Sequence, residues 1–334
     1  MAAIFPVQSP FNTTPDYSGS FIPQLWSNKL NAKFFAHTMM TEISNTSWEG
    51  EIKNQGDSIR IRTAPSITIN DYAGAGSTLS SEVPVPIFQD LQINKGKYFS
   101  VQVNDVLAHQ ADMDLMNMFT DDAAKQLKIA IENECFFQWF VTEGAKATTN
   151  KGATAGAISA SYDLGTDVAP IQQSTAGNLL KLILRMSAAL DEQNVPEEGR
   201  WLIMSPNDRH LLMQTDIAQA YFTGDSSSIV RTGKIGMLDR FTVYVSNLLP
   251  KGTTSKATVA GLTAASAGAT LSNAKPRRML VAGVSDAISF ASQITKTEPL
   301  RNQTDFGDIV RGLSVYGRKV VKNDAIVTAL IGSP

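Results

Sequence analysis

The sequence contains 334 residues, of which 43% are apolar and 18% charged, and its formal net charge at pH 7 is −2. This composition is typical of a globular protein and excludes a disordered chain, a collagen and a heptad-repeat rod. A single core stops growing near about 250–300 residues, so we expect one large irregular domain or two subdomains. The near-neutral charge argues against a protein that coats a nucleic-acid duplex, which needs a stripe of Lys and Arg.

The chain carries one cysteine, Cys135, which excludes an internal disulfide and fits a reducing compartment. Its first residues lack the cationic region and apolar core of a secretory signal. No apolar run approaches the roughly 20 residues that a membrane span needs. We therefore expect no membrane-spanning segment.

Residues 1–30 interleave prolines with aromatic side chains, which include Phe11, Tyr17, Phe21 and Trp26. The prolines restrict the backbone to extended conformations. The aromatic side chains are too numerous for a free tail, since they would expose a large apolar area to water. The segment is therefore an extended arm that folds back on its own domain or lies on a neighbouring subunit, and both interpretations stay open.

Residues 50–104 show the period-two alternation of half-buried strands on both sides of a polar, turn-rich stretch. The alternating apolar positions are Ile59, Ile61, Ile67 and Ile69 on the first flank and Phe99, Val101 and Val103 on the second. Two such flanks predict a long antiparallel hairpin. Because an isolated two-stranded hairpin is marginally stable in water, something outside it must cover its apolar face.

Residues 112–143 predict one long helix of about 48 Å, at 1.5 Å per residue. An apolar stripe at helical spacing contains Met116, Phe119, Ala123, Leu127 and Ala130. The opposite stripe, which we expect to face solvent, contains Asp121, Lys125, Lys128 and Glu132. Beyond residue 131 apolar side chains surround the helix, so this end, including Cys135, should be buried on several sides.

The second half of the chain predicts an αβ unit followed by returning strands. Residues 144–178 and 251–276 are rich in Gly, Ala, Ser and Thr and predict surface connections. The elements expected between and after them are a helix over 179–190, strands over 201–204, 241–245 and 279–282, and a helix from N-cap Ser205 to Tyr221. Residues 294–330 are strand-like, with Gly312 and Gly317 as bends.

No constellation of catalytic, cofactor-binding or metal-ligating residues stands out. His37, His109 and His210 lie far apart in the sequence, without metal-binding spacing. Residues 283–287 lack the last glycine of a nucleophile elbow, and residues 233–235 lack the context of a phosphate-binding loop. We therefore predict no catalytic residue, cofactor or metal.

The order of these elements resembles the major capsid protein of tailed bacteriophages over nearly the whole chain. Several local strings carry the resemblance, and their order counts for more than any one of them. They are residues 22–27, 48–50 and 56–61 for the arm and the loop after it, 200–206, 233–236, 241–243 and 246–248 for the αβ unit, and 305–310 and 315–320 for the returning strands.

The resemblance implies an α+β fold, the tailed-phage major capsid fold, with an N-terminal arm, a long E-loop hairpin, a P-domain with a long spine helix and an αβ A-domain. The implied divisions are 1–49 for the arm, 50–104 for the E-loop, 105–174 for the P-domain with spine helix 112–143, 175–284 for the A-domain with insertion 251–276, and 285–334 for the P-domain return strands. Loops 222–236 and 251–276 would meet near the centres of hexamers and pentamers.

The function that the resemblance implies is structural and not enzymatic. The chain would self-assemble as hexamers and pentamers into an icosahedral shell around the double-stranded DNA genome of a tailed phage. Its partners would be copies of itself, a separate scaffolding protein, a portal, optionally a decoration protein, and packaged DNA contacted without sequence specificity. The shell would assemble in the host cytoplasm and form the virion capsid.

Three alternative interpretations stay open. An encapsulin-type nanocompartment shares the fold and encloses protein cargo. A tail-tube subunit would form tubes. A hydrolase or transferase on residues 175–284 would require a pocket with convergent polar groups.

The residues that we expect at subunit contacts lie on the arm and on the hairpin. They are Phe11, Tyr17, Phe21, Trp26, Arg60, Arg62, Ile67 and Ile69. The two arginines share one face of the hairpin, where they either pair with carboxylates of a neighbour or form a solvated surface. Some relatives join E-loop and P-domain through a lysine–asparagine isopeptide bond. Because this sequence has no lysine between Asn54 and Asn94, we expect a shell held by non-covalent packing.

Overall fold

The computed structural model describes most of the chain after residue 34. The described residues are 35–47, 58–63, 65, 67–71, 81–105, 109, 115–143, 148–166, 169–172, 176–214, 236–253, 256–257 and 277–332. The predicted arm with Phe11, Tyr17, Phe21 and Trp26 lies outside these residues, as do most residues of the predicted loops 222–236 and 251–276. The predicted surface connection 144–178 is mostly described and is wrong at Ala155 and Leu164, which are 0% exposed because they pack in the core with α5 (Ala176–Glu192).

A mixed sheet of eight described strands forms one part of the molecule. Its path is β4 (Ile171–Gln172), β13 (Ile326–Gly332), β10 (Arg277–Val284), β5 (Arg200–Met204), β7 (Phe241–Val245) and β6 (Met237–Leu238), with β8 (Lys251–Thr253) paired to β10 and to β9 (Lys256–Ala257). The pairs β5–β7 and β4–β13 are parallel, and the other pairs are antiparallel. The three strands expected in the αβ unit are thereby confirmed.

Two helices accompany this sheet. α5 (Ala176–Glu192) confirms the first helix predicted for the αβ unit. α6 (Pro206–Met213) begins as predicted at Ser205, whose hydroxyl oxygen accepts a hydrogen bond from the backbone N–H of Asp208 at 3.3 Å. α6 ends well before Tyr221, where the prediction placed its end.

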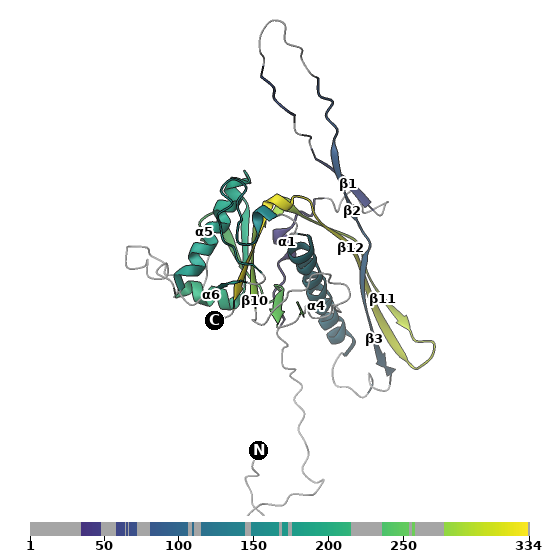
Figure 1. Cartoon of the computed structure of the whole chain (residues 1–334). Helices are drawn as coiled ribbons and strands as arrows, with labels where there is room; N and C mark the ends of the chain where they lie inside the picture. Colours follow the sequence, from purple (N-terminus) through teal and green to yellow (C-terminus); the bar gives the residue numbers. More distant parts are fainter. Residues whose placement is uncertain are drawn as a thin grey trace, which may run out of the picture.

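Both faces of the eight-stranded sheet are buried, because successive residues of a strand point to opposite sides. In β5, Leu202 and Met204 belong to a cluster that includes α5, whereas Trp201 and Ile203 belong to a cluster with the end of α4 (Leu115–Phe136). Figure 1 shows the sheet between α5 and α4. The molecule therefore has a central sheet with a helical layer on each side.

A second sheet contains β11 (Ile288–Arg301), β12 (Gly307–Val320) and β3 (Lys95–Asn104), antiparallel and in that order. α4 lies beside this sheet (Figure 1) and continues into the π-helix η1 (Phe137–Glu143). α4 and η1 together confirm the long helix predicted over 112–143, within the described residues. Its second half is buried as predicted, with Cys135 fully inaccessible.

The membership of two strands differs from the prediction. β3 pairs with β12, where Val101 lies opposite Val310, instead of pairing with the first flank of the hairpin. β13 pairs with β10, so the last strand does not return to the sheet of β11 and β12. The burial patterns explain this: nearly every residue of β13 is buried, as a sheet covered on both faces requires, whereas burial alternates along β3.

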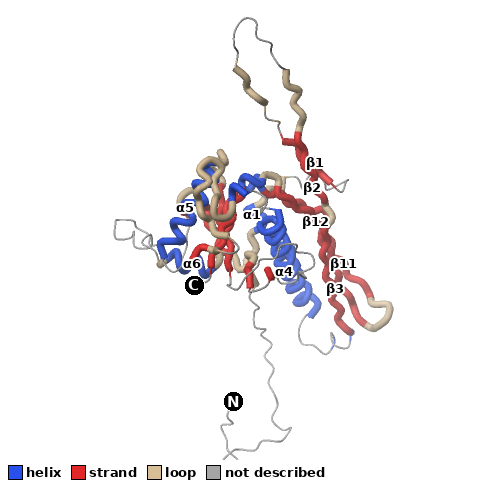
Figure 2. The backbone as a smooth tube through the Cα atoms, viewed as in Figure 1, coloured by secondary structure: helices blue, strands red, loops and turns tan. Residues whose placement is uncertain are grey.

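The hairpin consists of β1 (Ser58–Thr63) and β2 (Ile87–Gln92), so its second strand is not the run around residue 101. Its base packs on the three-stranded sheet through the buried residues Ile61, Leu91, Ile93 and Ala291. Beyond the base, residues 67–71 and 81–86 continue without strand pairing and point away from the body of the molecule (Figure 2). Ile67 and Ile69 therefore lie in an extended stretch and not in a strand.

Short helices connect these parts. They are α1 (Met40–Ile43) and the 3₁₀ helices η3 (Thr148–Asn150), η5 (Ser285–Ala287) and η6 (Asn323–Ala325). The segment after α1 forms a parallel bridge to β11, in which Asn45 pairs with Ser289. This bridge ties the chain that leads out of the N-terminal part to the three-stranded sheet.

The solvent-facing stripe of α4 is confirmed at Asp121, Lys125 and Lys128, which are exposed. It is wrong at Glu132, which is 1% exposed, and the apolar stripe is wrong at Ala130, which is exposed. The reason lies outside the helix. The backbone before α1 packs on this side of α4 and donates hydrogen bonds to the Glu132 carboxylate.

Gly312 and Gly317 lie inside the continuous strand β12 and are not bends. A Cβ atom on Gly312 would collide with the ring of Phe99, its neighbour on β3. A Cβ atom on Gly317 would lie 2.6 Å from the backbone oxygen of Gln92 and 3.0 Å from the side chain of Ile93. Glycine is needed here because the connection from β2 to β3 crosses β12 at this point.

Replacing Gly317 by alanine should lower the free energy of unfolding by about 1–3 kcal/mol, because the added methyl group pushes the base of the hairpin away from β12. Gly236→Ala is the matched control, since nothing lies within 4 Å of a Cβ atom at that position. Urea unfolding of both variants measures the difference. Equal stability of the two variants would contradict this packing.

Candidate assembly surfaces

The hairpin beyond its base carries a set of exposed apolar side chains. Ile69 is 90% exposed, Val83 82% and Val85 74%. The whole set, called the apolar strip, comprises Ile67, Ile69, Val83, Val85, Ile87 and Phe88. A concentration of exposed large apolar side chains on one segment marks an interaction site on a protein surface. The apolar strip is therefore the first candidate assembly surface.

Arg60 and Arg62 lie next to the apolar strip on β1, and both are exposed. Arg60 Nε lies 3.0 Å from Oδ1 of Asp90, its partner across the hairpin, and the Asp90 carboxylate raises the pKa of the guanidinium. The guanidinium carbon also lies 4.3 Å from the centre of the Phe88 ring. The structure thus gives Arg60 a carboxylate within its own hairpin, while Arg62 stands opposite Phe88 in the register.

The base of the hairpin, which includes Ile87 and Phe88 of the apolar strip, is held firmly. Besides its buried cluster, the Gln89 side-chain amide donates a hydrogen bond to the backbone oxygen of Val321 at 2.9 Å. β1 and β2 are paired over six positions, from Ser58 opposite Gln92 to Thr63 opposite Ile87. A two-stranded ribbon anchored in this way can present its far end to another molecule.

A partly buried charge network holds the surface below the hairpin together. Glu134 of α4 lies 2.7 Å from Lys97 Nζ of β3, accepts a hydrogen bond from the Tyr316 hydroxyl at 3.0 Å, and pairs with Arg318. Burial raises the pKa of Glu134, but the hydrogen bonds from Lys97 and Arg318 outweigh burial and lower this pKa to about 2. The network clamps α4 to β3 and β12.

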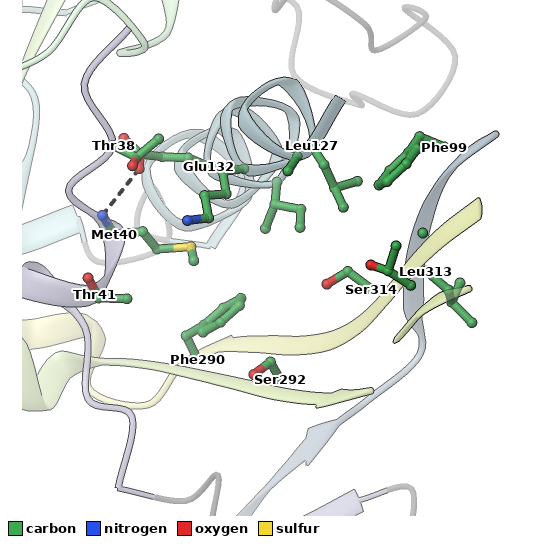
Figure 3. A pocket seen from close by; sticks show the side chains of 15 residues that line it. Thr38, Met40, Thr41, Phe99, Leu127, Glu132, Phe290, Ser292, Leu313 and Ser314 are labelled. Carbon is green, nitrogen blue, oxygen red and sulfur yellow. Dashed lines mark hydrogen bonds between the residues drawn. The ribbon is translucent and has the colours of Figure 1, made fainter. Parts of the chain in front are cut away.

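A cavity of about 370 Å³ opens between α4, the segment around α1 and the three-stranded sheet. Figure 3 shows Leu127 and Glu132 of α4, Phe99 and Phe290 of the sheet, and Met40 of α1 around it. Its walls are mainly apolar, and Glu132 is the only buried carboxylate among its described lining residues. This cavity is the second candidate functional feature.

The described residues give little support for catalytic or metal chemistry. Within them, no group of three or more His, Cys, Asp or Glu side chains could hold a metal ion. Burial raises the pKa of the Cys135 thiol to about 12, so this thiol is a poor nucleophile. None of the helices in the described part combines the length and the apolar character that crossing a membrane requires.

Comparison with known proteins identifies the family of the chain. A family model described as phage capsid protein matches residues 89–329, which is more than half of the chain. The chain belongs to the phage capsid protein family. It is a capsid protein, and its place is in the virion.

Solved structures share the fold of this capsid protein. A chain from Mycobacterium phage Che8 is 24% identical with a TM-score of 0.71, and the match covers 92% of this chain and 96% of that one. The capsid structure of cyanophage P-SCSP1u is 15% identical with a TM-score of 0.66, covering 92% of both chains. The capsid of cyanophage Pam1 is 13% identical with a TM-score of 0.65, covering 95% and 98%. No curated protein matches the chain.

The structure places the predicted contact residues of the hairpin together but leaves the others untested. Ile67 and Ile69 belong to the apolar strip, and Arg60 and Arg62 lie beside it. The sequence-based prediction missed the opposite edge of the strip around Val83 and Val85, although the Val-Pro-Val-Pro string over 83–86 marks an extended apolar segment. It also missed Glu132, for which the sequence alone holds no signal of burial.

Glu134→Gln should lower the free energy of unfolding by about 3 kcal/mol at pH 7, because the folded pKa near 2 lies about 2.5 units below the ordinary value of 4.5. Because the pKa of Glu134 is lower in the folded than in the unfolded protein, its ionisation stabilises the fold fully above pH 4.5. This stabilisation is lost as the pH falls toward 2. The loss should therefore shrink to about 2 kcal/mol at pH 3.5. Urea unfolding at both pH values, with the exposed Glu198→Gln as control, measures it. The same loss at both pH values would contradict the network.

Proposed function

We propose that this capsid protein assembles as hexamers and pentamers into an icosahedral shell around the double-stranded DNA genome of a tailed phage. We further propose that the hairpin lies on an adjacent copy, which covers the apolar strip. The observation that carries the proposal is the strip itself, since side chains such as Ile69 and Val83 are more than four-fifths exposed in the single chain. The shell role makes the chain a structural protein rather than an enzyme.

The energetics favour coverage by a neighbour. Fully burying one Val, Ile or Phe side chain contributes about 1.5–3 kcal/mol. Association also costs free energy, because two molecules lose translational and rotational freedom, and the low end of this cost is several kcal/mol. Burial of the six side chains of the apolar strip contributes more than that. The pairing of β1 with β2 lowers the cost of ordering Ile87 and Phe88, since both residues already belong to β2.

The arm and the arginines belong to the same proposal. Phe11, Tyr17, Phe21 and Trp26 supply aromatic contact area on a second neighbour, which is the choice we make between the two placements of the arm. Arg62 is the hairpin arginine proposed to pair with a carboxylate of a neighbour, since Arg60 already pairs with Asp90. A separate scaffolding protein, a portal and, optionally, a decoration protein complete the assembly. It takes place in the host cytoplasm and leaves packaged DNA in non-specific contact with the shell.

The double variant Ile67→Ser with Ile69→Ser should abolish closed particles and leave the subunit folded, because it removes apolar contact area without touching the hairpin base. Electron microscopy and sedimentation of the expressed chain measure particle formation, and urea unfolding measures subunit stability. Ile158→Ser is the matched control, since Ile158 is 82% exposed far from the hairpin in sequence. Normal particles from the double variant would refute coverage of the apolar strip by a neighbour.

Mature particles should give one band on a denaturing gel, at the chain mass of 36.1 kDa, because no lysine lies on the hairpin between Asn54 and Asn94 to form a covalent bridge. A ladder of higher bands would contradict a shell held by non-covalent packing alone. Analysis of the same particles for double-stranded DNA separates a phage shell from a nanocompartment, which would hold protein cargo.

A further inference from the structure

Glu132 caps a helix that belongs to another part of the chain. Its Oε2 accepts hydrogen bonds from the backbone N–H groups of Met39, at 2.8 Å, and Met40, at 3.2 Å (Figure 3 draws the second). These groups begin α1, and the N-cap residue Met39 contributes no side-chain hydrogen bond of its own. Free N–H groups at a helix start need an acceptor, and here α4 provides it.

The second oxygen of the same carboxyl group has a different environment. Glu132 Oε1 is buried and has no hydrogen-bond partner among the described residues. The side chain is 1% exposed and lines the cavity of about 370 Å³ beside α4. A buried ionised oxygen without a partner is costly, whereas the neutral carboxyl group is tolerated there.

In the described part of the chain, few charged or titratable groups face this carboxyl group, and one of them is the buried Cys135 thiol of α4. α1 contributes the carboxylate of Glu42, and α4 contributes Lys128, which lines the same cavity. The described lining residues that β3, β11 and β12 contribute to the cavity are uncharged, among them Phe99, Phe290 and Ser314. Burial is the largest influence on the pKa of Glu132 and raises it. The hydrogen bonds from Met39 and Met40 lower this pKa by less, and repulsion by Glu42 raises it a little, so the pKa is about 7.

The segment held by Glu132 runs along α4 from the end of the predicted arm. Lys125 Nζ lies 5.0 Å from the centre of the Phe35 ring, and Glu132 binds the backbone around Met39, so residues 35–39 follow about 10 Å of the helix. After α1, the bridge between Asn45 and Ser289 fixes the chain to β11. Met39 and Ile43 are also buried in the core beside α4, at 2% and 0% exposure. Loss of the Glu132 contact would therefore weaken the attachment of residues 35–43 without abolishing it, while the residues after Asn45 would stay attached to β11.

We propose that Glu132 is a protonation-sensitive latch: its neutral form keeps residues 35–43 against α4, and its ionised form favours their detachment. The biological role of the latch rests on the proposed function: the latch would control whether the arm stays with its own subunit or becomes available to a neighbour. Its physical basis lies within the single chain. Failure of the latch would therefore leave the shell function intact, and failure of the shell function would leave the latch measurable.

The two states determine the direction of the pH effect. In the detached state Glu132 meets water, and its pKa returns to the ordinary value near 4.5, whereas the attached state has a pKa of about 7. The attached state therefore holds the proton more tightly, and attachment weakens as the pH rises from 4.5 to 7. The detachment equilibrium should increase by about 300-fold over the full range and by about 30-fold between pH 5.5 and pH 8.5.

Hydrogen exchange of the full-length chain, read on the peptide that covers residues 35–43, tests the latch. The protection factor, corrected for the intrinsic pH dependence of exchange, should fall by about 30-fold between pH 5.5 and pH 8.5. Glu132→Gln, a neutral side chain of the same shape, should remove this pH dependence and keep the peptide protected. Glu42→Gln removes a negative charge that raises the pKa of Glu132. The pH at which protection is lost should therefore be lower in this variant.

The controls separate the latch from general unfolding. Peptides from β10 report the core of the same molecule and should keep their protection at every pH. Glu198→Gln, an exposed glutamate on the connection after α5, should behave like the unchanged chain. Constant protection of residues 35–43 across the pH range, or an unchanged pH dependence in Glu132→Gln with β10 still protected, would overturn the proposal.

Discussion

The apolar strip of the hairpin is a constraint that the described part of the chain does not meet by itself. β1 and β2 lift Ile67, Ile69, Val83 and Val85 away from the body, where no described residue covers them. Water opposes such an arrangement, because apolar surface of this extent favours association. A shell made of many copies satisfies the constraint, since each copy can cover the strip of its neighbour. Membership of the phage capsid protein family gives this arrangement a function.

The rest of the fold holds the base of the hairpin in place. The eight-stranded sheet is buried on both faces, and the end of α4 forms part of one of its two cores. From there α4 reaches the three-stranded sheet, to which Glu134, Lys97 and Arg318 clamp it. The same helix holds the start of α1 through Glu132. One helix therefore connects the core, the hairpin base and the end of the arm.

Patterns of local sequence predicted most of the elements, and contacts between distant residues account for the errors. The alternation around Ile61 and Val101 correctly indicated strands, but strand partners depend on packing, so β3 joined β12 and not β1. Glu132 stood on a polar stripe of α4, and only the backbone of residues 39–40 explains its burial. The exposed isoleucines of the strip were expected at a contact because nothing nearby in sequence could cover them. Their valine counterparts across the hairpin were missed, because the Val-Pro-Val-Pro string indicates extended backbone but does not indicate whether its valines are covered.

The central claim concerns what covers the apolar strip in the assembled particle, and electron cryomicroscopy of shells formed by the unaltered chain tests it most directly. The account predicts that a map of these shells places residues 67–69 and 83–88 of each hairpin in contact with an adjacent copy. A map in which these side chains face solvent, or rest on the body of their own subunit, would contradict it.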